Sequence, residues 1–265
     1  YTGDPGCYQK NAAYLDAVTP SKMKATFAKW IDDTPYVLTI LPTDKYSVGE
    51  TDLDRSAGVP FPIEKVEFQF PTLQTATLSN GAKVVLAQRK GVPLVEMNFQ
   101  FNFGYAQENN DELGYTNFMM SMLNEGTKKY SSLEFDEVLD SLGSNLGFGS
   151  GLDTSVATLS SLKANLSQTL DLAKEALINP TFPEKEIERI KKETLAGIIQ
   201  EENRPASIAY RNIGKLLYGD DHPYGKPLTG SGISETISSI TRANIMDVHS
   251  RAINSAHLTF AVAGD

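Results

Sequence analysis

The sequence has little cysteine, little histidine and no long apolar run, and each shortage excludes something. The one cysteine, Cys7, cannot form an internal disulfide, and no histidine stands near it in the sequence to make a nucleophile–base pair. No apolar run reaches the roughly 20 residues that a membrane-spanning helix needs. The chain opens at Tyr1 with neither a Met nor an apolar signal segment, which we interpret as a cut end.

Positive charge is the scarcer sign, with 24 Lys and Arg against 33 Asp and Glu and a formal net charge of -9. This balance argues against nucleic acid or an anionic membrane surface as a partner. At 265 residues and 40% hydrophobic content, the chain is long enough for one large domain, or for one domain and a piece of another.

An internal repeat favours the second arrangement. Val18–Ile40 aligns without gaps with Ile240–Val262, an offset of 222 residues. Each segment opens with a branched residue and a Thr suited to cap a helix, continues with apolar residues at helical spacing, and ends in a short apolar strand. The strands are expected at Tyr36–Ile40 and Leu258–Val262.

The repeat predicts the domain organisation. Residues 1–41 would be the C-terminal helix and strand of a preceding repeat, and residues 76–265 most of the next one. Residues 42–75 read as a linker, because Pro42–Pro62 is rich in Asp, Gly and Pro and lacks periodicity. The chain is then a slice of a longer tandem protein.

The second part of the chain predicts strands first and helices afterwards. "ATLSNGAKVVLAQ" indicates a hairpin around Asn80-Gly81, and the alternation in "VEMNFQFNF" indicates a half-buried strand. A Gly-kinked strand pair is expected in "SNLGFGSGLDTSVATLSSL". Helices are expected at residues 112–124, 131–142, 166–178, 184–202, 206–218 and 242–253, before a final strand. This order predicts an α+β fold, with helices packed on one face of a mostly antiparallel sheet.

One of these helices has the form of a zinc site. Two histidines four residues apart on a helix share a face and can hold zinc, and a glutamate just before the second can activate the bound water. "GYTNFMMSMLNEGTKKYS", from Gly114, resembles the signature of the insulinase/pitrilysin-type zinc peptidases, roughly G-L-A-H-F-L-E-H-M-L-F-K-G-T-K-K-Y-S. The retained frame is Gly114, Phe118, Met122, Leu123, Gly126, Thr127, Lys128, Lys129, Tyr130 and Ser131.

The residues that would carry the chemistry are replaced. Asn117 stands at the first histidine, Met120 at the glutamate base and Ser121 at the second histidine. The resemblance puts the third ligand, a Glu on a later helix, at Gly197, which is 76 residues after Ser121. A neutral amide, a thioether, an unionised hydroxyl and a glycine cannot form this centre. We therefore predict no catalytic residue and no metal ligand in this segment. The mid-helix Gly197 indicates either close helix packing or a position released from a ligand role.

The resemblance covers about 190 residues, including "DDHPYGKPLTGS" and the ending "LTFAVAGD". It implies a metallopeptidase-like domain of the kind found in the mitochondrial processing peptidase. It further implies four homologous domains in two halves that close around a peptide, with zinc in the catalytic half alone. The implied partners are that half, in the same or a companion chain, and a peptide or protein substrate. The alternative is a wholly inactive structural or assembly homologue. For bacterial members of this layout, the family expectation is export to the periplasm.

The remaining candidates have plainer interpretations. The three histidines lack metal spacing: His222 is expected to bond its own loop, His249 to lie on a helix surface and His257 at a strand edge. Met119, Met120 and Met122 are expected to fill the core.

Overall fold

The computed structural model of the chain describes residues 6–31, 37–39, 71–254 and 258–265. The chain divides into two compact units, Tyr1–Val66 and Glu67–Asp265. Residues 40–70 lie outside the described residues, and they include most of the predicted linker, residues 42–75. Also outside the described residues are His257 and the two ends of the predicted strand Tyr36–Ile40.

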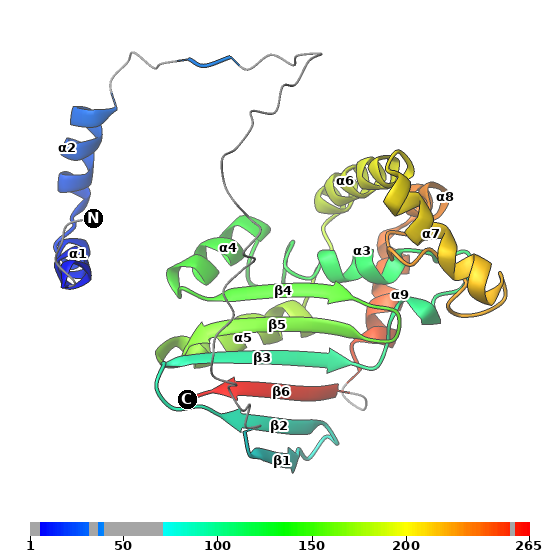
Figure 1. The fold of residues 1–265 in the computed structure, drawn as a ribbon, viewed down its shortest axis with the longest axis horizontal. Coiled ribbons are helices and arrows are strands. Elements are labelled where there is room, and N and C mark those ends of the chain that lie inside the picture. Colours follow the sequence, from blue (N-terminus) through cyan, green and yellow to red (C-terminus); the bar gives the residue numbers. More distant parts are fainter. Residues whose placement is uncertain (1–5, 32–36, 40–70, 255–257) are drawn as a thin grey trace, which may run out of the picture. The chain divides into compact units, whose positions relative to one another are not determined.

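The first unit contains two helices, α1 (Cys7–Asp16) and α2 (Pro20–Trp30) (Figure 1). The side chain of Thr19 caps α2 by accepting a hydrogen bond from the backbone N–H of Lys22 at 3.3 Å, and Pro20 occupies the first helical position. Neither helix has a buried residue. Residues 37–39, the described part of the predicted strand, form no strand.

The second unit is built on a six-stranded sheet with the order β1-β2-β6-β3-β5-β4. The strands are β1 (Leu73–Thr77), β2 (Lys83–Gln88), β3 (Leu94–Phe101), β4 (Asn145–Ser150), β5 (Ser155–Leu162) and β6 (Leu258–Gly264). Only β2 and β6 pair in parallel, so the predicted mostly antiparallel sheet is confirmed. The sheet begins at Leu73, inside the predicted linker.

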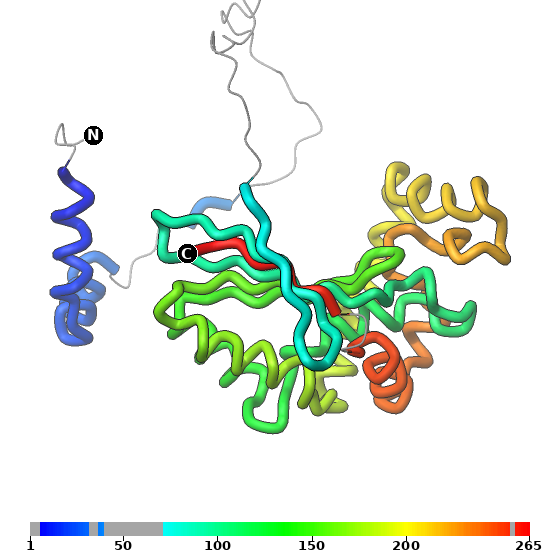
Figure 2. Tube along the Cα trace, turned by 90° about the horizontal axis from the view of Figure 1, so that it is seen from below, coloured from blue at the N-terminus to red at the C-terminus, as the bar shows by residue number. Residues whose placement is uncertain are grey.

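The helices of this unit are α3 (Tyr115–Ser121), α4 (Ser132–Ser141), α5 (Leu166–Ile178), α6 (Glu184–Glu202), α7 (Pro205–Tyr218), α8 (Ser234–Ser239) and α9 (Arg242–Ala252). Short 3-10 turns occur at Tyr105–Gln107 and Lys163–Asn165. Helices α4 and α5 pack on one face of the sheet, while α3 and α6 to α9 gather at one end of it (Figures 1 and 2). No helix among the described residues is long and apolar enough to cross a membrane.

The alternation, turn and capping patterns of the sequence account for most of these strands and helices. In β3, Val95, Phe99 and Phe101 are buried while the alternate residues are exposed. Gly81, at φ 86°, forms the predicted hairpin turn. Helix α4 starts at the predicted capping box, in which Ser131 and Glu134 each accept from the other's backbone N–H. Helix α8 has no counterpart among the predicted elements.

Helix α3 is shorter than predicted at both ends. Gly114 has φ 92°, and the buried carboxylate of Glu108 accepts hydrogen bonds from the N–H groups of Gly114 (2.9 Å) and Thr116 (2.6 Å). This carboxylate caps the helix three residues after its predicted start. After Ser121, bonds from Met122 N to Met119 O and from Leu123 N to Met120 O tighten the backbone into a final turn.

Candidate functional site

The side chain of Asn117 ties α3 to two other segments. Its Nδ2 donates to the carbonyl oxygen of Gly230 at 3.0 Å, and its Oδ1 accepts from the backbone N–H of Ser150 at 3.0 Å. Gly230 lies in the α7–α8 loop, residues 219–233, and Ser150 is the last residue of β4. The amide therefore uses a donor and an acceptor in structural bonds at the position of the first expected histidine.

Met120 and Ser121, at the expected glutamate and second histidine, differ in burial. Met120 has no exposed surface and belongs to the main apolar cluster, together with Met119, Met122 and Leu123. The predicted core role of this methionine group is confirmed. Ser121 is exposed, and its Oγ donates to the carbonyl oxygen of Phe118 at 2.8 Å, within its own helix. Met120 therefore lies in the core, and the Ser121 hydroxyl bonds the backbone of its own helix.

Gly197 lies in the middle of α6, and a Cβ built on it meets no atom within 4 Å. Close helix packing, one of the two explanations of this glycine, is therefore wrong. By contrast, a Cβ on Gly214 in α7 would lie 2.5 Å from the carbonyl oxygen of Tyr224 and 2.8 Å from that of Lys226. The two mid-helix glycines thus have different causes, and only Gly214 is required by its neighbours.

The donors present at these four positions do not fit a zinc ion. Zinc in proteins takes imidazole nitrogen, thiolate sulfur or carboxylate oxygen. Here the set is an amide in two structural bonds, a buried thioether, a hydroxyl bonded to its own helix and no side chain at all. Elsewhere in the described residues, no group of three His, Cys, Asp or Glu side chains is placed to hold a metal.

A buried pair of opposite charges supports the start of α3. Glu108 is 6% exposed and Lys226 is 8% exposed. The Lys226 ammonium donates to the carbonyl oxygens of Ala106 (2.8 Å) and Glu108. Burial raises the pKa of Glu108, against the lowering effect of its hydrogen bonds and of Lys226. Burial likewise lowers the pKa of Lys226, against the charges of Glu108 and Glu112.

A second cation holds the other end of the α7–α8 loop. The guanidinium of Arg211, whose side chain is 8% exposed, donates to Glu201 Oε2 at 2.6 Å and to Ser231 Oγ at 2.9 Å. It also donates to the carbonyl oxygen of Gly232 at 2.8 Å. The sequence did not predict the roles of Arg211, Glu108 and Lys226, because no local motif marks them, and Ala106 lies 120 residues from Lys226.

The edge strand β4 ends beside Asn117. Gly151 donates to the carbonyl oxygen of Thr154 in the β4–β5 hairpin, so Gly151 faces β5 and the residues of opposite parity face away. The backbone groups of Leu146 and Phe148 therefore point to the open side of the sheet, as Ser150 does toward Asn117. Such an edge can accept an added strand.

The structure describes two of the three histidines, His222 in a loop and His249 on α9. His222 Nδ1 accepts from the backbone N–H of Tyr224 at 3.0 Å, as expected of a loop residue. The expectation for His249 was wrong: its ring is half-buried, with Nε2 2.8 Å from the carbonyl oxygen of Leu177 and an edge contact to Phe182. Burial lowers the pKa of His249, against the effect of the bond to Leu177.

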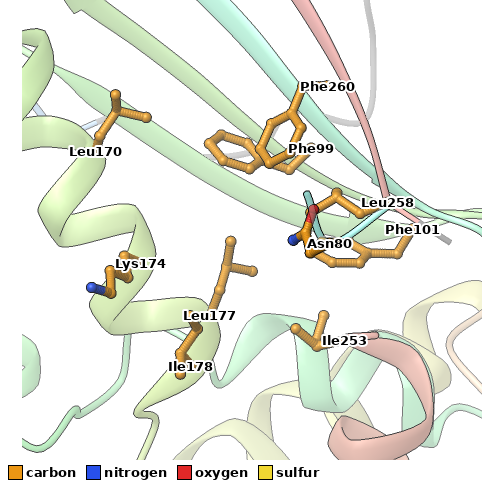
Figure 3. Close-up of a pocket in the computed structure, with 10 residues that line it drawn as sticks. All are labelled: Asn80, Phe99, Phe101, Leu170, Lys174, Leu177, Ile178, Ile253, Leu258 and Phe260. Atoms are coloured by element: carbon orange, nitrogen blue, oxygen red, sulfur yellow. The ribbon is translucent and has the colours of Figure 1, made fainter. Parts of the chain in front are cut away.

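An apolar cavity of about 490 Å³ lies between α5 and the sheet, where β3 and β6 run side by side (Figure 3). Its residues are Asn80, Phe99, Phe101, Leu170, Lys174, Leu177, Ile178, Ile253, Leu258 and Phe260. The rings of Phe99 and Phe260 meet edge to face at 5.1 Å on its floor. Among the described residues that line the cavity, Lys174 is the one that carries a charge.

Comparison with known proteins identifies relatives. The model of the family described as "Insulinase (Peptidase family M16)" matches residues 83–230. An uncharacterized zinc protease of Rickettsia felis is 26% identical over 188 residues, covering 71% of this chain and 45% of that protein. The non-peptidase homolog YmxG of Helicobacter pylori is 24% identical over 204 residues, covering 74% of this chain and 46% of that protein.

Two solved structures share the fold. The peptidase M16 inactive domain from Pseudomonas fluorescens is 31% identical with a TM-score of 0.69, over 73% of this chain and 47% of that one. The periplasmic protease PqqL from Escherichia coli is 20% identical with a TM-score of 0.65, over 76% of this chain and 23% of that one. The chain spans less than half the length of these relatives.

Proposed function

Because the chain belongs to the insulinase family of peptidases, family M16, we propose that it is a non-catalytic part of a zinc metalloendopeptidase. In this proposal the zinc site lies in another half, and this segment helps to enclose and bind a peptide substrate. The observation that carries it is the donor set at Asn117, Met120, Ser121 and Gly197, which we interpret as a degenerate form of the zinc site. The relatives named zinc proteases support zinc chemistry in the family.

The β4 edge supports a role in holding the peptide. The outward backbone groups of Leu146 and Phe148 can pair with an extended chain, which gains affinity through main-chain hydrogen bonds. The tie from Asn117 to Ser150 fixes the end of this edge. We propose that substrate lies along β4 while the other half of the protein brings zinc to it.

Cleavage by separately purified halves tests this role. The chain alone should cleave no peptide, with or without added zinc, and should raise kcat/KM when mixed with the zinc-bearing half. Zinc-dependent cleavage by the chain alone would contradict the proposal. No change in kcat/KM on mixing would contradict the enclosing role.

A matched pair of variants isolates the edge strand. Leu146→Pro and Leu146→Ala both remove the same side chain, but only Pro removes the outward N–H. We expect the Pro variant to support peptide cleavage by the mixed halves less well than the Ala variant, with similar folding by circular dichroism. Equal rates for the two variants would show that peptide does not pair with β4.

The second candidate is a wholly inactive assembly protein. It is favoured by one relative, which is named a non-peptidase homolog. The two candidates differ in the other half: an intact zinc motif there predicts cleavage by the whole protein, and a second degenerate motif predicts none. Zinc content and peptide cleavage of the whole natural protein decide between them.

An exported location is the remaining part of the proposal. Its support is indirect, since one protein with this fold is a periplasmic protease. Fractionation of the source cells tests it: the protein should appear with periplasmic markers, and recovery with cytoplasmic markers would contradict it.

A further inference from the structure

The apolar cavity between α5 and the sheet is a feature that the proposed function does not use. Its volume of about 490 Å³ is within the range of pockets that hold small molecules. Its floor is deeply buried, since Phe99, Phe101 and Leu177 are 6%, 3% and 6% exposed. Its mouth is open, because Ile178 is 62% exposed and Lys174 is exposed as well. A ligand can therefore enter between these two residues and reach a buried apolar floor.

Lys174 interrupts the row of apolar side chains with which α5 faces this cavity. Leu170, Lys174, Leu177 and Ile178 all line the cavity, and their spacing puts them on one face of the helix. Figure 3 shows Leu170 and Leu177 turned toward the strands, with Lys174 between them along the helix. A helix face that only closed a core would carry an apolar residue at position 174.

The charge of Lys174 is not used by the described part of the chain. Its ammonium makes no hydrogen bond and no ion pair with the described residues. The other polar side chain of the described lining is Asn80, whose Oδ1 accepts a hydrogen bond from the N–H of Ala82 at 3.1 Å. The cavity thus combines a positive charge at its mouth with apolar walls. This combination complements a ligand that has an apolar body and one negative charge.

We propose that the cavity binds the aliphatic chain of a fatty acid, with the carboxylate at Lys174. An apolar cavity of about 150 Å³ can hold one benzene molecule, so this larger cavity has room for a chain of roughly a dozen carbons. The stretch of α5 from Leu170 to Ile178 is about 12 Å long, which is comparable to the length of such a chain. The edge-to-face rings of Phe99 and Phe260 form the floor beneath it.

A peptide segment suits this cavity less well than an aliphatic chain. Each peptide unit would carry an N–H and a C=O into the apolar interior, where Asn80 is the one neutral polar side chain of the described lining. An aliphatic chain has no such groups, and its single carboxylate stays in water at the mouth, beside Lys174. The inference is independent of the proposed function, since it needs neither zinc nor a peptide substrate.

Binding of dodecanoate to the whole chain tests this inference. Calorimetric titration below the micelle concentration should show one saturable site, and dodecanol, which lacks the charge, should bind there more weakly. In the unmodified chain, nuclear Overhauser contacts should join the methylenes of bound dodecanoate to the methyl groups of Leu177 and Leu258. The absence of a saturable site, or contacts with α1 and α2 instead, would overturn the proposal. Displacement of dodecanoate by a neutral apolar tripeptide amide would overturn it in favour of a peptide occupant.

Three variants locate the two parts of the ligand. Lys174→Gln removes the charge at the mouth, and Lys185→Gln removes the same charge from a side chain on α6 that is 92% exposed. We expect Lys174→Gln to weaken dodecanoate binding by about twofold to fivefold and to leave dodecanol binding unchanged, and Lys185→Gln to change neither. Leu170→Phe extends a ring into the cavity and should weaken both ligands by about tenfold or more. Equal loss of dodecanoate binding in the two lysine variants, or full binding by folded Leu170→Phe, would overturn the proposal.

Discussion

Asn117, which the resemblance places at the first histidine of the zinc motif, has a structural role in this chain. Its amide donates to Gly230 and accepts from Ser150, so it joins α3, β4 and the α7–α8 loop. Its two backbone partners, Gly230 and Ser150, therefore define its role as a link between these elements.

Asn117→Ala should destabilise the second unit by about 1 to 2 kcal/mol, because it leaves the Ser150 N–H and the Gly230 carbonyl without partners. Urea unfolding measures the change. Ser121→Ala is the matched control, since its hydroxyl is exposed and bonds only its own helix, and it should change stability by less than about 0.5 kcal/mol. Equal effects of the two substitutions on stability would contradict a stabilising role for the two Asn117 hydrogen bonds.

His249 should make stability depend on pH. Its pKa is lowered in the folded state by burial, so the unfolded chain binds a proton at a pH where the folded chain does not. This contribution to stability is present above the unfolded pKa of about 6.5 and is lost as the pH falls from there toward the folded pKa. Denaturation followed from pH 7.5 to 5 should show the fall, and His249→Gln should flatten it. An identical slope in the variant would assign the pH dependence to other groups.

At the scale of elements, two glycines in adjacent helices should respond in opposite directions. Gly197→Ala should stabilise α6 by roughly 0.5–1 kcal/mol, since the added methyl meets open space. Gly214→Ala should destabilise the fold by about 1–3 kcal/mol, because the methyl would strike the carbonyl oxygens of Tyr224 and Lys226. The midpoints of urea unfolding of the two variants measure these stability changes. A destabilised Gly197→Ala would show that this position is packed after all.

The sequence predicts those elements whose signals are local. The hairpin at Gly81, the capping box at Ser131 and the alternation in β3 all agree with the structure, because turn chemistry, caps and periodicity act over a few residues. The ends of α3 and the surroundings of His249 do not. Glu108 bonds the start of α3 from six and eight residues away without forming a recognised capping motif, and Leu177 lies 72 residues from His249.

The candidate site, too, could be predicted only in part from the sequence. The resemblance predicts that Asn117, Met120, Ser121 and Gly197 stand at the zinc-site positions, but it does not predict which groups these residues contact. The buried Lys226 and Arg211, which anchor the α7–α8 loop, carry no sequence signal because their partners include backbone carbonyls far along the chain. Only the folded chain reveals such anchors.

At the scale of the molecule, the chain combines a first unit that contains α1 and α2 with a second unit built on a sheet. The second unit has a six-stranded sheet, helices on one face and a cluster of helices at one end. Its relatives include both zinc proteases and a non-peptidase homolog. The same frame therefore occurs in proteins of both names, and our proposal of a non-catalytic segment rests on the side chains at Asn117, Met120, Ser121 and Gly197.

The zinc content of the purified chain tests that account most directly. After equilibration with excess zinc and desalting, elemental analysis should find no more than about a tenth of an equivalent, because the four positions offer no imidazole, thiolate or carboxylate. About one equivalent of zinc, lost when His222, His249 or His257 is changed to Ala, would contradict it and reveal a metal site built from other residues.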